Sequence, residues 1–332
     1  MSSEHANLEP IEPHRAQDLY LDHKTTDCVE ATVQAHRYRT NHFVRWCAEN
    51  DVTNLNDLTG RNLQEYRLWR QDDGDLKRIT LKQQMSTIRV FLQWCASIEA
   101  VSPTLSEKVM VPTVGPAEER REETLDADSA GAILDYLSTY QYASRDHAAF
   151  SLLWETGIRS GAAYSLDVRD VDVDDQRINV VHRPATGTRL KNGRRGERPI
   201  AISDALAEML DDYISTTRND IQDDHGRNPL LSTTNGRMHR GTLRCLIYRV
   251  TAPCFRGEPC PDCTGTSERK CGEAVSPHSV RRGSITHFLT KDVPVEVVSD
   301  RMNVSRDVLD KHYDKRSEEV KLEQRRGYLD KV

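Results

Sequence analysis

Residues 276–288 read SPHSVRRGSITHF, and they combine the start of a helix with a histidine and an arginine three positions apart. Pro277 suits the first turn of a helix, where a missing backbone N–H costs no hydrogen bond. His278 and Arg281 would leave the same face of this helix side by side, because three positions are nearly one turn. The stretch therefore predicts either a pair that grips an anion or an ordinary solvated helix face.

A second arginine stands upstream in the segment LLWETGIRSGAAYSL, residues 152–166. The pattern predicts an apolar helix, a turn around Arg159 and a second short helix. Gly157 and Gly161 flank Arg159 and let the backbone turn, so that one guanidinium projects from a largely buried region. A buried arginine needs an anion or a carboxylate as its partner. The alternative is an ordinary turn with a solvent-exposed arginine.

Between these two segments, the sequence predicts a pair of strands, RINVVHR at 177–183 and ERPIAIS at 197–203. They are joined by the basic loop RPATGTRLKNGRRGE, in which Lys191 is the single lysine. A lysine at such a hairpin tip can swing into a site and donate a proton, and the arginines around it can hold phosphates. The alternative is a solvated basic hairpin.

Downstream of residue 288, the segment VLDKHYDKRS at 308–317 contains Tyr313. We expect this tyrosine to lie late in a helix whose N-terminus Ser305 can cap. Most tyrosines are packing residues with a polar tip, so Tyr313 alone favours that ordinary structural role. A functional role for Tyr313 can be inferred only in combination with the motifs that precede it in the chain.

The composition limits the class of protein. The chain has 332 residues, of which 37% are hydrophobic and 30% charged, and its net charge is −6. It contains no apolar run of membrane-spanning length and no signal-peptide core near the start, so we expect a soluble, cytoplasmic protein. Negative net charge argues against nucleic-acid binding, but the basic loop concentrates arginine, which suits phosphate contacts. An acidic surface with basic grooves fits a protein that works in high salt.

The chain is long enough for two domains. Residues 15–110 predict helices throughout, whereas the later part adds the strand pair to its helices. The segment TVGPAEERREE combines Gly, Pro and a charge run, which is typical of a linker. We therefore predict a helical domain at 1–112, a linker at 113–123 and a mainly α domain with a small β-sheet at 124–332 (α+β).

The second domain also contains a cysteine-rich insertion at 254–271, with Cys254, Cys260, Cys263 and Cys271. The CPDC knuckle has the spacing of a zinc finger, and four thiolates in a short Gly/Pro-rich loop suit tetrahedral Zn²⁺. A closed four-cysteine site has no open position, so the zinc would be structural and not catalytic. The alternative is a set of unmetallated or redox-active cysteines.

The order of these features resembles the tyrosine recombinase (phage integrase) family, and most closely its archaeal, particularly haloarchaeal, integrases. The likeness covers most of the chain. The helices TVQAHRYRTNHFVRWC at 32–47 and TLKQQMSTIRVFLQWC at 80–95 look like the N-terminal DNA-clamp helices of that family. The resemblance implies a core-binding (SAM-like) helical domain followed by a tyrosine-recombinase catalytic domain.

By this resemblance, Tyr313 attacks a DNA phosphate, forms a covalent 3′-phosphotyrosyl bond and releases a 5′ hydroxyl. Arg159 and Arg281 would hold the phosphate, His278 would assist proton transfer and Lys191 would protonate the leaving oxygen. No cofactor is implied for catalysis. The implied partners are double-stranded DNA and other protomers, as a tetramer in the synapse.

Two positions depart from the family pattern. Ala162 stands where the family usually has an acid, three residues after the first arginine. The family commonly has a histidine about nine residues before the tyrosine. Asn303 stands near that position, but it lies one residue farther from Tyr313 than the usual histidine would. Its amide can donate a hydrogen bond to a phosphate oxygen but not a proton. These departures leave open a non-catalytic DNA-binding regulator that keeps the integrase fold.

Overall fold

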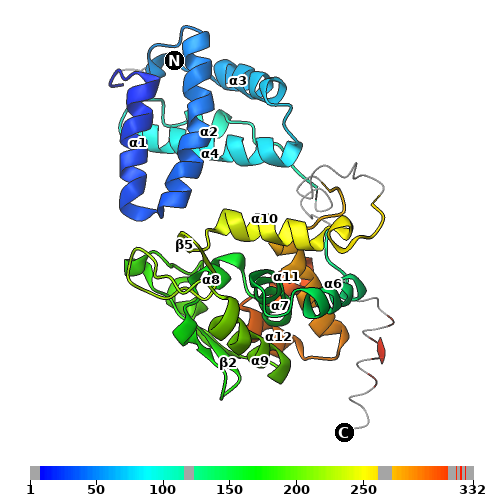
Figure 1. Cartoon of the computed structure of the whole chain (residues 1–332). Helices are drawn as coiled ribbons and strands as arrows, with labels where there is room; N and C mark the ends of the chain where they lie inside the picture. The colour runs from blue at the N-terminus through cyan, green and yellow to red at the C-terminus, as the bar shows by residue number, and fades with distance from the viewer. Residues whose placement is uncertain are drawn as a thin grey trace. The chain divides into compact units, whose positions relative to one another are not determined.

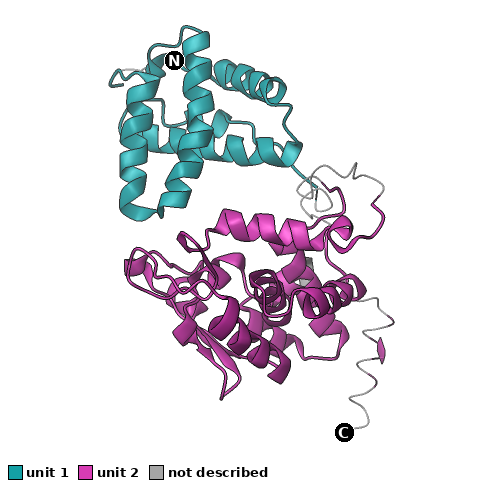
Figure 2. Ribbon diagram, in the orientation of Figure 1, with its two compact units in different colours: residues 1–121 teal, residues 122–332 magenta. Residues whose placement is uncertain are grey.

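The computed structural model describes residues 8–115, 123–260 and 271–312, together with positions 319, 322–323 and 326. For positions 310–312 only the backbone is described. The chain divides into two compact units, residues 1–121 (unit 1) and 122–332 (unit 2) (Figure 2). Each unit has its own hydrophobic core.

Unit 1 is helical over its described residues, as the sequence predicted. Its helices are α1 (Pro13–Asp27), α2 (Glu30–Glu49), α3 (Gly60–Asp73) and α4 (Arg78–Ser97), with 3₁₀ turns at Leu55–Asp57 and Leu105–Lys108 (Figure 1). Thr59 starts α3 by a capping box with Asn62. Tyr20, Phe43 and Phe91 are fully buried, because the apolar faces of α1, α2 and α4 pack on one another.

Unit 2 is built around α7, in which almost every side chain is buried. This helix packs against α6, α9, α10 and α11 (Figure 1). The helices of the unit are α6 (Ala127–Tyr140), α7 (Arg145–Thr156), α8 (Ser160–Ser165), α9 (Asp204–Asp212), α10 (Arg240–Thr251), α11 (Pro277–Thr290), α12 (Val295–Met302) and α13 (Arg306–His312). Shorter helical turns lie at Val168–Asp170, Pro184–Thr186, Gly193–Gly196, Tyr213–Thr217 and Pro253–Arg256.

The predicted strand pair is present, but it belongs to a larger set of strands. β2 (Arg177–Val180) pairs antiparallel with β3 (Arg198–Ala201), and β1 (Val171–Asp172) adds a third strand beside β2. A second sheet joins β4 (Ser232–Thr233) to β5 (Gly236–Arg237). The expectation of a single strand pair was therefore wrong. Two-residue strands carry no periodic pattern, so the sequence alone could not reveal them.

A buried ion-pair network fixes the base of the loop between β2 and β3. Arg183 donates to the Oδ2 atom of Asp170 at 2.8 Å, and Arg227 donates to Thr188 Oγ1 at 2.9 Å. Asp167 is 1% exposed and pairs with Arg237. Arg183 thus has carboxylate partners inside the protein, so at least one arginine of the basic loop is structural.

None of the helices in the described ranges is long and apolar enough to cross a bilayer.

Gly283 marks the tightest contact between α11 and the segment that precedes α6. An ideal Cβ on Gly283 would lie 1.9 Å from the carbonyl oxygen of Leu125. The backbone N–H of Leu125 donates to the carbonyl of Ser279 at 3.3 Å, which ties the two segments together. We expect Gly283→Ala to lower the free energy of unfolding by about 3 kcal/mol, because overpacking against backbone has no flexible side chain to displace.

Urea unfolding of the full chain measures this effect, with Gly131→Ala as the matched control. Gly131 also lies in a helix, but a Cβ there meets no atom within 4 Å. That control should be neutral or up to about 1 kcal/mol more stable, since alanine is the better helix former. Equal midpoints for the two variants would contradict the predicted clash.

Candidate active site

α11 places His278 and Arg281, and its start is formed by local signals. The Ser276 side chain accepts a hydrogen bond from the N–H of Ser279 at 3.2 Å, and Pro277 occupies the first turn, as predicted. Arg281 is only 2% exposed and donates to the carbonyls of Gly157 and Met302. Arg281 therefore does not lie on a solvated helix face, which excludes that alternative for this residue.

The C-terminal end of α12 gathers three arginines. The last carbonyls of a helix have no partner within the helix, and they carry a partial negative charge that attracts cations. Here three successive carbonyls each accept from a different guanidinium. The pairs are Arg198 Nε with the carbonyl of Arg301 (2.6 Å), Arg281 Nη2 with that of Met302 (2.9 Å) and Arg159 Nη1 with that of Asn303 (2.9 Å). Residues from β3, α11 and the α7–α8 turn thus meet at one point.

The backbone conformation and the tight packing at position 157 explain why a glycine stands two residues before Arg159. The φ of Gly157 is 58°, in the left-handed region that most side chains avoid, and Gly157 ends α7. An ideal Cβ there would lie 2.7 Å from the sulfur of Met302. The turn therefore brings α7 against the end of α12 and sets Arg159, which is half-buried, beside Arg281.

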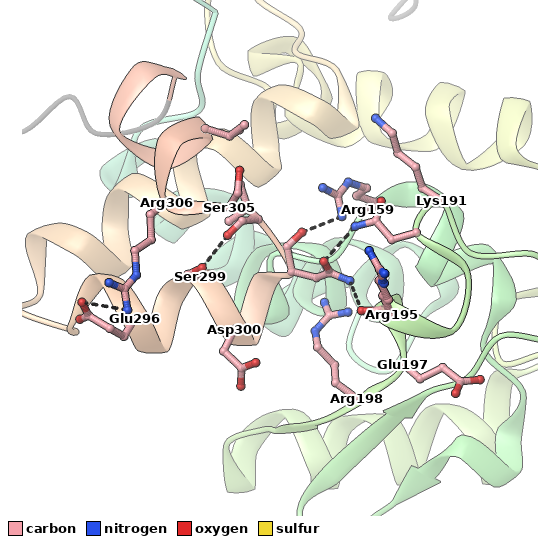
Figure 3. Close-up of a pocket in the computed structure, with 14 residues that line it drawn as sticks. Arg159, Lys191, Arg195, Glu197, Arg198, Glu296, Ser299, Asp300, Ser305 and Arg306 are labelled. Atoms are coloured by element: carbon pink, nitrogen blue, oxygen red, sulfur yellow. Dashed lines mark hydrogen bonds and ion pairs between the residues drawn. The ribbon is translucent and has the colours of Figure 1, made fainter.

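A pocket of about 560 Å³ opens beside this point (Figure 3). Arg159, Arg195 and Arg198 lie on one wall, and Glu296 and Arg306 lie on the opposite one (Figure 3). The pocket is also lined by Lys191, Asn192, Glu197, Ser299, Asp300, Asn303, Val304, Ser305 and Val308. The cation-rich wall can accept an anionic group.

His278 lies among these cations. Desolvation, together with the positive charges of Arg282, Arg281, Arg159 and Lys191, lowers the pKa of His278 to about 4. The residue as a whole is exposed, so its imidazole stays within reach of an incoming group. At neutral pH the ring is uncharged and can accept a proton.

We expect an NMR pH titration of the DNA-free protein to place the pKa of His278 near 4, well below its ordinary value of 6.5. The unfolded chain binds a proton at higher pH than the folded chain, so this residue lowers stability as the pH falls from about 6.5 towards 4. Binding of a phosphate-bearing oligonucleotide should raise the pKa, because the anion offsets the surrounding charges. Titration of His278 at 6.5 in the free protein would contradict the clustering of cations around it.

The structure brings Arg159, Lys191, His278, Arg281 and Asn303 to one region of unit 2. Tyr313 lies outside the described residues, directly after the end of α13 at His312. The sequence interpretation missed two residues of this region, Arg198 and Asn192. No local pattern marked either one, because both stand among other polar residues of the β2–β3 segment.

The cysteine-rich insertion is only partly described. Cys254, Cys260 and Cys271 are described, and the sulfurs of Cys260 and Cys271 lie 3.3 Å apart. Cys271 is buried beside Ala252 and Ala274. Cys263 lies outside the described residues. Among the described residues, no group of three or more His, Cys, Asp or Glu side chains is arranged to hold a metal ion.

Comparison with known proteins gives family matches over both units. Residues 123–319 match the phage integrase family, and residues 18–97 match the phage integrase N-terminal SAM-like domain. A tyrosine recombinase from Pseudothermotoga lettingae is 23% identical over 277 residues, which is 82% of this chain and 83% of that protein. The archaeal origin expected from the sequence stays a prediction.

Two solved structures share the fold. A lambda integrase dimer bound to a COC′ core site has a TM-score of 0.67 and 15% identity, covering 93% of this chain and 79% of that chain. The Tn1549 transposon integrase in complex with transposon right end DNA has a TM-score of 0.65 and 13% identity, covering 97% of this chain and 99% of that chain. Together with the family match over most of unit 2, these findings lead to one conclusion: the chain belongs to the phage integrase family.

Proposed function

We propose that this protein is a site-specific DNA recombinase that cleaves and rejoins DNA through a covalent 3′-phosphotyrosyl intermediate. The observation that carries this proposal is the convergence of Arg159 and Arg281 on the C-terminal end of α12, beside a cation-rich pocket. Membership of the phage integrase family supports recombination as the reaction class.

In the cleavage step, the Tyr313 oxygen bonds to phosphorus and the bond from phosphorus to the 5′ oxygen breaks. Negative charge grows on the non-bridging oxygens of the phosphate. Arg159 and Arg281 are held in place before the DNA arrives, so their N–H groups can stabilise this charge with little reorganisation. Arg281 is buried, where such an interaction is stronger than in water.

The protons move through two other side chains. A tyrosine hydroxyl has a pKa of about 10, so it needs a base or nearby cations to become a nucleophile. His278 is uncharged at neutral pH and can take the hydroxyl proton. Lys191 can give a proton to the departing 5′ oxygen. Rejoining is the reverse of this step and needs no cofactor, since the phosphotyrosyl bond keeps the energy of the original one.

Double-stranded DNA is the proposed substrate and partner. The similarity to an integrase solved as a dimer on DNA supports further protomers as partners. We extend this to a tetramer in the synapse, where two duplexes exchange strands. We also propose that the helical unit 1 contacts the duplex.

The alternative is a DNA-binding regulator that keeps the fold without the chemistry, and a covalent-trapping assay separates the two. Bound duplexes are first selected from a randomised pool. Selected duplexes are then nicked close to the cleavage position, so that the short fragment released with the 5′ hydroxyl diffuses away and rejoining is prevented. A recombinase gives an SDS-resistant protein–DNA adduct. Binding without any adduct on any nick position would support the regulator.

We also propose a structural zinc ion bound by Cys254, Cys260, Cys263 and Cys271. The short distance between the Cys260 and Cys271 sulfurs supports a shared ligand set, although the fourth cysteine lies outside the described residues. Four thiolates close the coordination sphere, so such an ion would stabilise the insertion that precedes α11 without entering the reaction.

Protein purified under reducing conditions without chelator should therefore contain about one Zn²⁺ per chain by elemental analysis. Cys260→Ser should lose the metal, whereas Cys245→Ser should keep it, because Cys245 lies in α10 outside the insertion. Absence of zinc from the wild-type protein would refute the metal site and leave the unmetallated alternative.

A further inference from the structure

The side chain of Asn303 makes its contacts with the loop that carries Lys191. Its Oδ1 atom accepts a hydrogen bond from Asn192 Nδ2 at 3.0 Å. Its Nδ2 atom donates to the backbone carbonyl of Arg195 at 3.3 Å. Both ends of the amide are thus engaged by the β2–β3 loop. This use of the amide differs from the phosphate contact that the sequence suggested.

The backbone of Asn303 connects the same residue to a second part of the site. Its φ and ψ are 49° and 62°, the left-handed conformation that ends α12. Asparagine adopts this conformation more readily than most residues, and glycine adopts it most readily. The carbonyl of Asn303 accepts from Arg159. One residue therefore joins the end of α12, Arg159 and the loop.

The loop is packed tightly against this residue. Gly196 is buried, and an ideal Cβ on it would lie 3.2 Å from Asn303 Nδ2 and 3.3 Å from a methyl carbon of Leu190. A Cβ at position 196 would require the side chain of Asn303 or Leu190 to shift by a few tenths of an ångström. The close approach is therefore a feature of the loop and not of the asparagine alone.

Lys191 itself is exposed, but both of its neighbours are anchored. Leu190 is 5% exposed, and its N–H donates to His182 Nδ1 at 3.0 Å. Asn192, on the other side, is bonded to Asn303. The path of the backbone through Lys191 is fixed from two sides, and one of them depends on Asn303. The lysine side chain, which lines the pocket, therefore extends from a defined position of the backbone.

We propose that Asn303 is a positioning residue: through Asn192 and the carbonyl of Arg195, it holds the β2–β3 loop where the Lys191 ammonium meets the leaving 5′ oxygen of the DNA. The proposal rests on the proposed recombinase function. It assigns Asn303 no contact with the substrate. It also gives Asn192 a role that its position in a basic loop does not suggest.

The test separates loss of the proton donor from loss of other catalytic contacts. When the P–O5′ bond breaks, the electron pair goes to the 5′ oxygen, which needs a proton from Lys191. When sulfur replaces that oxygen, a thiolate leaves, and it needs no proton because thiols are far more acidic than alcohols. A variant that only misplaces Lys191 therefore cleaves the oxygen substrate slowly and the sulfur substrate at nearly the normal rate.

Three variants are compared with the wild-type protein in single-turnover cleavage of both substrates: Lys191→Ala, Asn303→Gly and Asn192→Ala. Asn303→Gly keeps the left-handed backbone and removes only the amide, so the fold should persist. We expect Asn303→Gly and Asn192→Ala to slow cleavage of the oxygen substrate by up to about 10²-fold, the cost of a misplaced group. On the sulfur substrate, all three variants should approach the wild-type rate.

Two further measurements sharpen the result. The double variant Asn192→Ala/Asn303→Gly should be no slower than the slower single variant, because both substitutions break one connection. Asn235→Ala changes an exposed asparagine in the β4–β5 turn and should cleave both substrates normally.

The cleavage rates distinguish failure of the positioning role from failure of the recombinase function. If the Asn303→Gly variant is slowed equally on both substrates, or not slowed at all, the positioning role is wrong while the recombinase function stands. If the wild-type protein cleaves neither substrate, the recombinase function fails and the inference fails with it. If Lys191→Ala is not restored by sulfur, Lys191 is not the proton donor, and the proposed role of Asn303 is overturned for that reason.

Discussion

Tyr313→Phe should abolish covalent attachment to DNA while binding persists. The phenol oxygen is the proposed nucleophile, and phenylalanine keeps the ring while removing only that atom. A replacement hydroxyl would have to be aligned with the same phosphorus atom to attack it, so we expect no adduct at all. The measurement is the SDS-resistant adduct on a nicked duplex, with binding followed separately by gel shift.

Tyr140→Phe is the matched control, because Tyr140 is an exposed tyrosine at the end of α6 and takes no part in the proposed site. Its adduct should form as in the wild-type protein. An adduct that persists in the Tyr313→Phe variant would move the nucleophile to another residue and would remove the basis for the family-derived role of Tyr313.

Arg159→Ala should slow cleavage by about 10²–10³-fold, since this is the usual effect of removing one preorganised donor from a transition state. Arg159 is half-buried and donates to the carbonyl of Asn303, whereas Arg281 is almost fully buried, so the Arg159 substitution should disturb the fold less than the loss of Arg281 would. The cleavage rate is measured under single-turnover conditions at saturating protein. Arg169→Ala controls for the loss of one positive charge, because the Arg169 side chain is 66% exposed and pairs with Asp167. Equal cleavage rates for the two variants would show that Arg159 is an ordinary turn arginine without a role in cleavage.

Arg281→Ala should slow cleavage to a similar extent, but it should also reduce stability. The sequence suggested that the partner of this arginine would be the substrate alone. In the folded protein Arg281 is 2% exposed and donates to the carbonyls of Gly157 and Met302. Its removal would leave a cavity and two buried carbonyls without these donors. Cleavage and urea unfolding should therefore both be measured for this variant.

Several parts of the site could be predicted from the sequence because their signals are local. Ser276 and Pro277 begin α11 through hydrogen bonds and backbone angles within one helical turn. Gly157 ends α7 because only a short stretch of chain decides a left-handed turn. The β2–β3 pair follows from two β-rich runs on either side of a basic loop. These signals placed Arg159, Lys191, His278 and Arg281 on the right elements.

The role of Asn303 illustrates what local signals miss. As an isolated residue it suggested a hydrogen-bond donor for phosphate. Its amide instead meets Asn192, which is 111 positions away in the chain. No pattern in either segment indicates this partner, because the contact depends on how the β2–β3 loop and the end of α12 pack together.

The sequence by itself determined the family, the mainly helical fold with a small sheet, and the order of the arginines, the lysine and the histidine along the chain. Only the tertiary structure decided that three arginines share the last carbonyls of α12, and that Arg183 belongs to a buried ion-pair network. The physical reason is the range of the interactions. Caps, turns and helix periodicity act over a few residues, whereas Arg159 and the carbonyl it bonds are 144 positions apart and meet only when the core of unit 2 has packed.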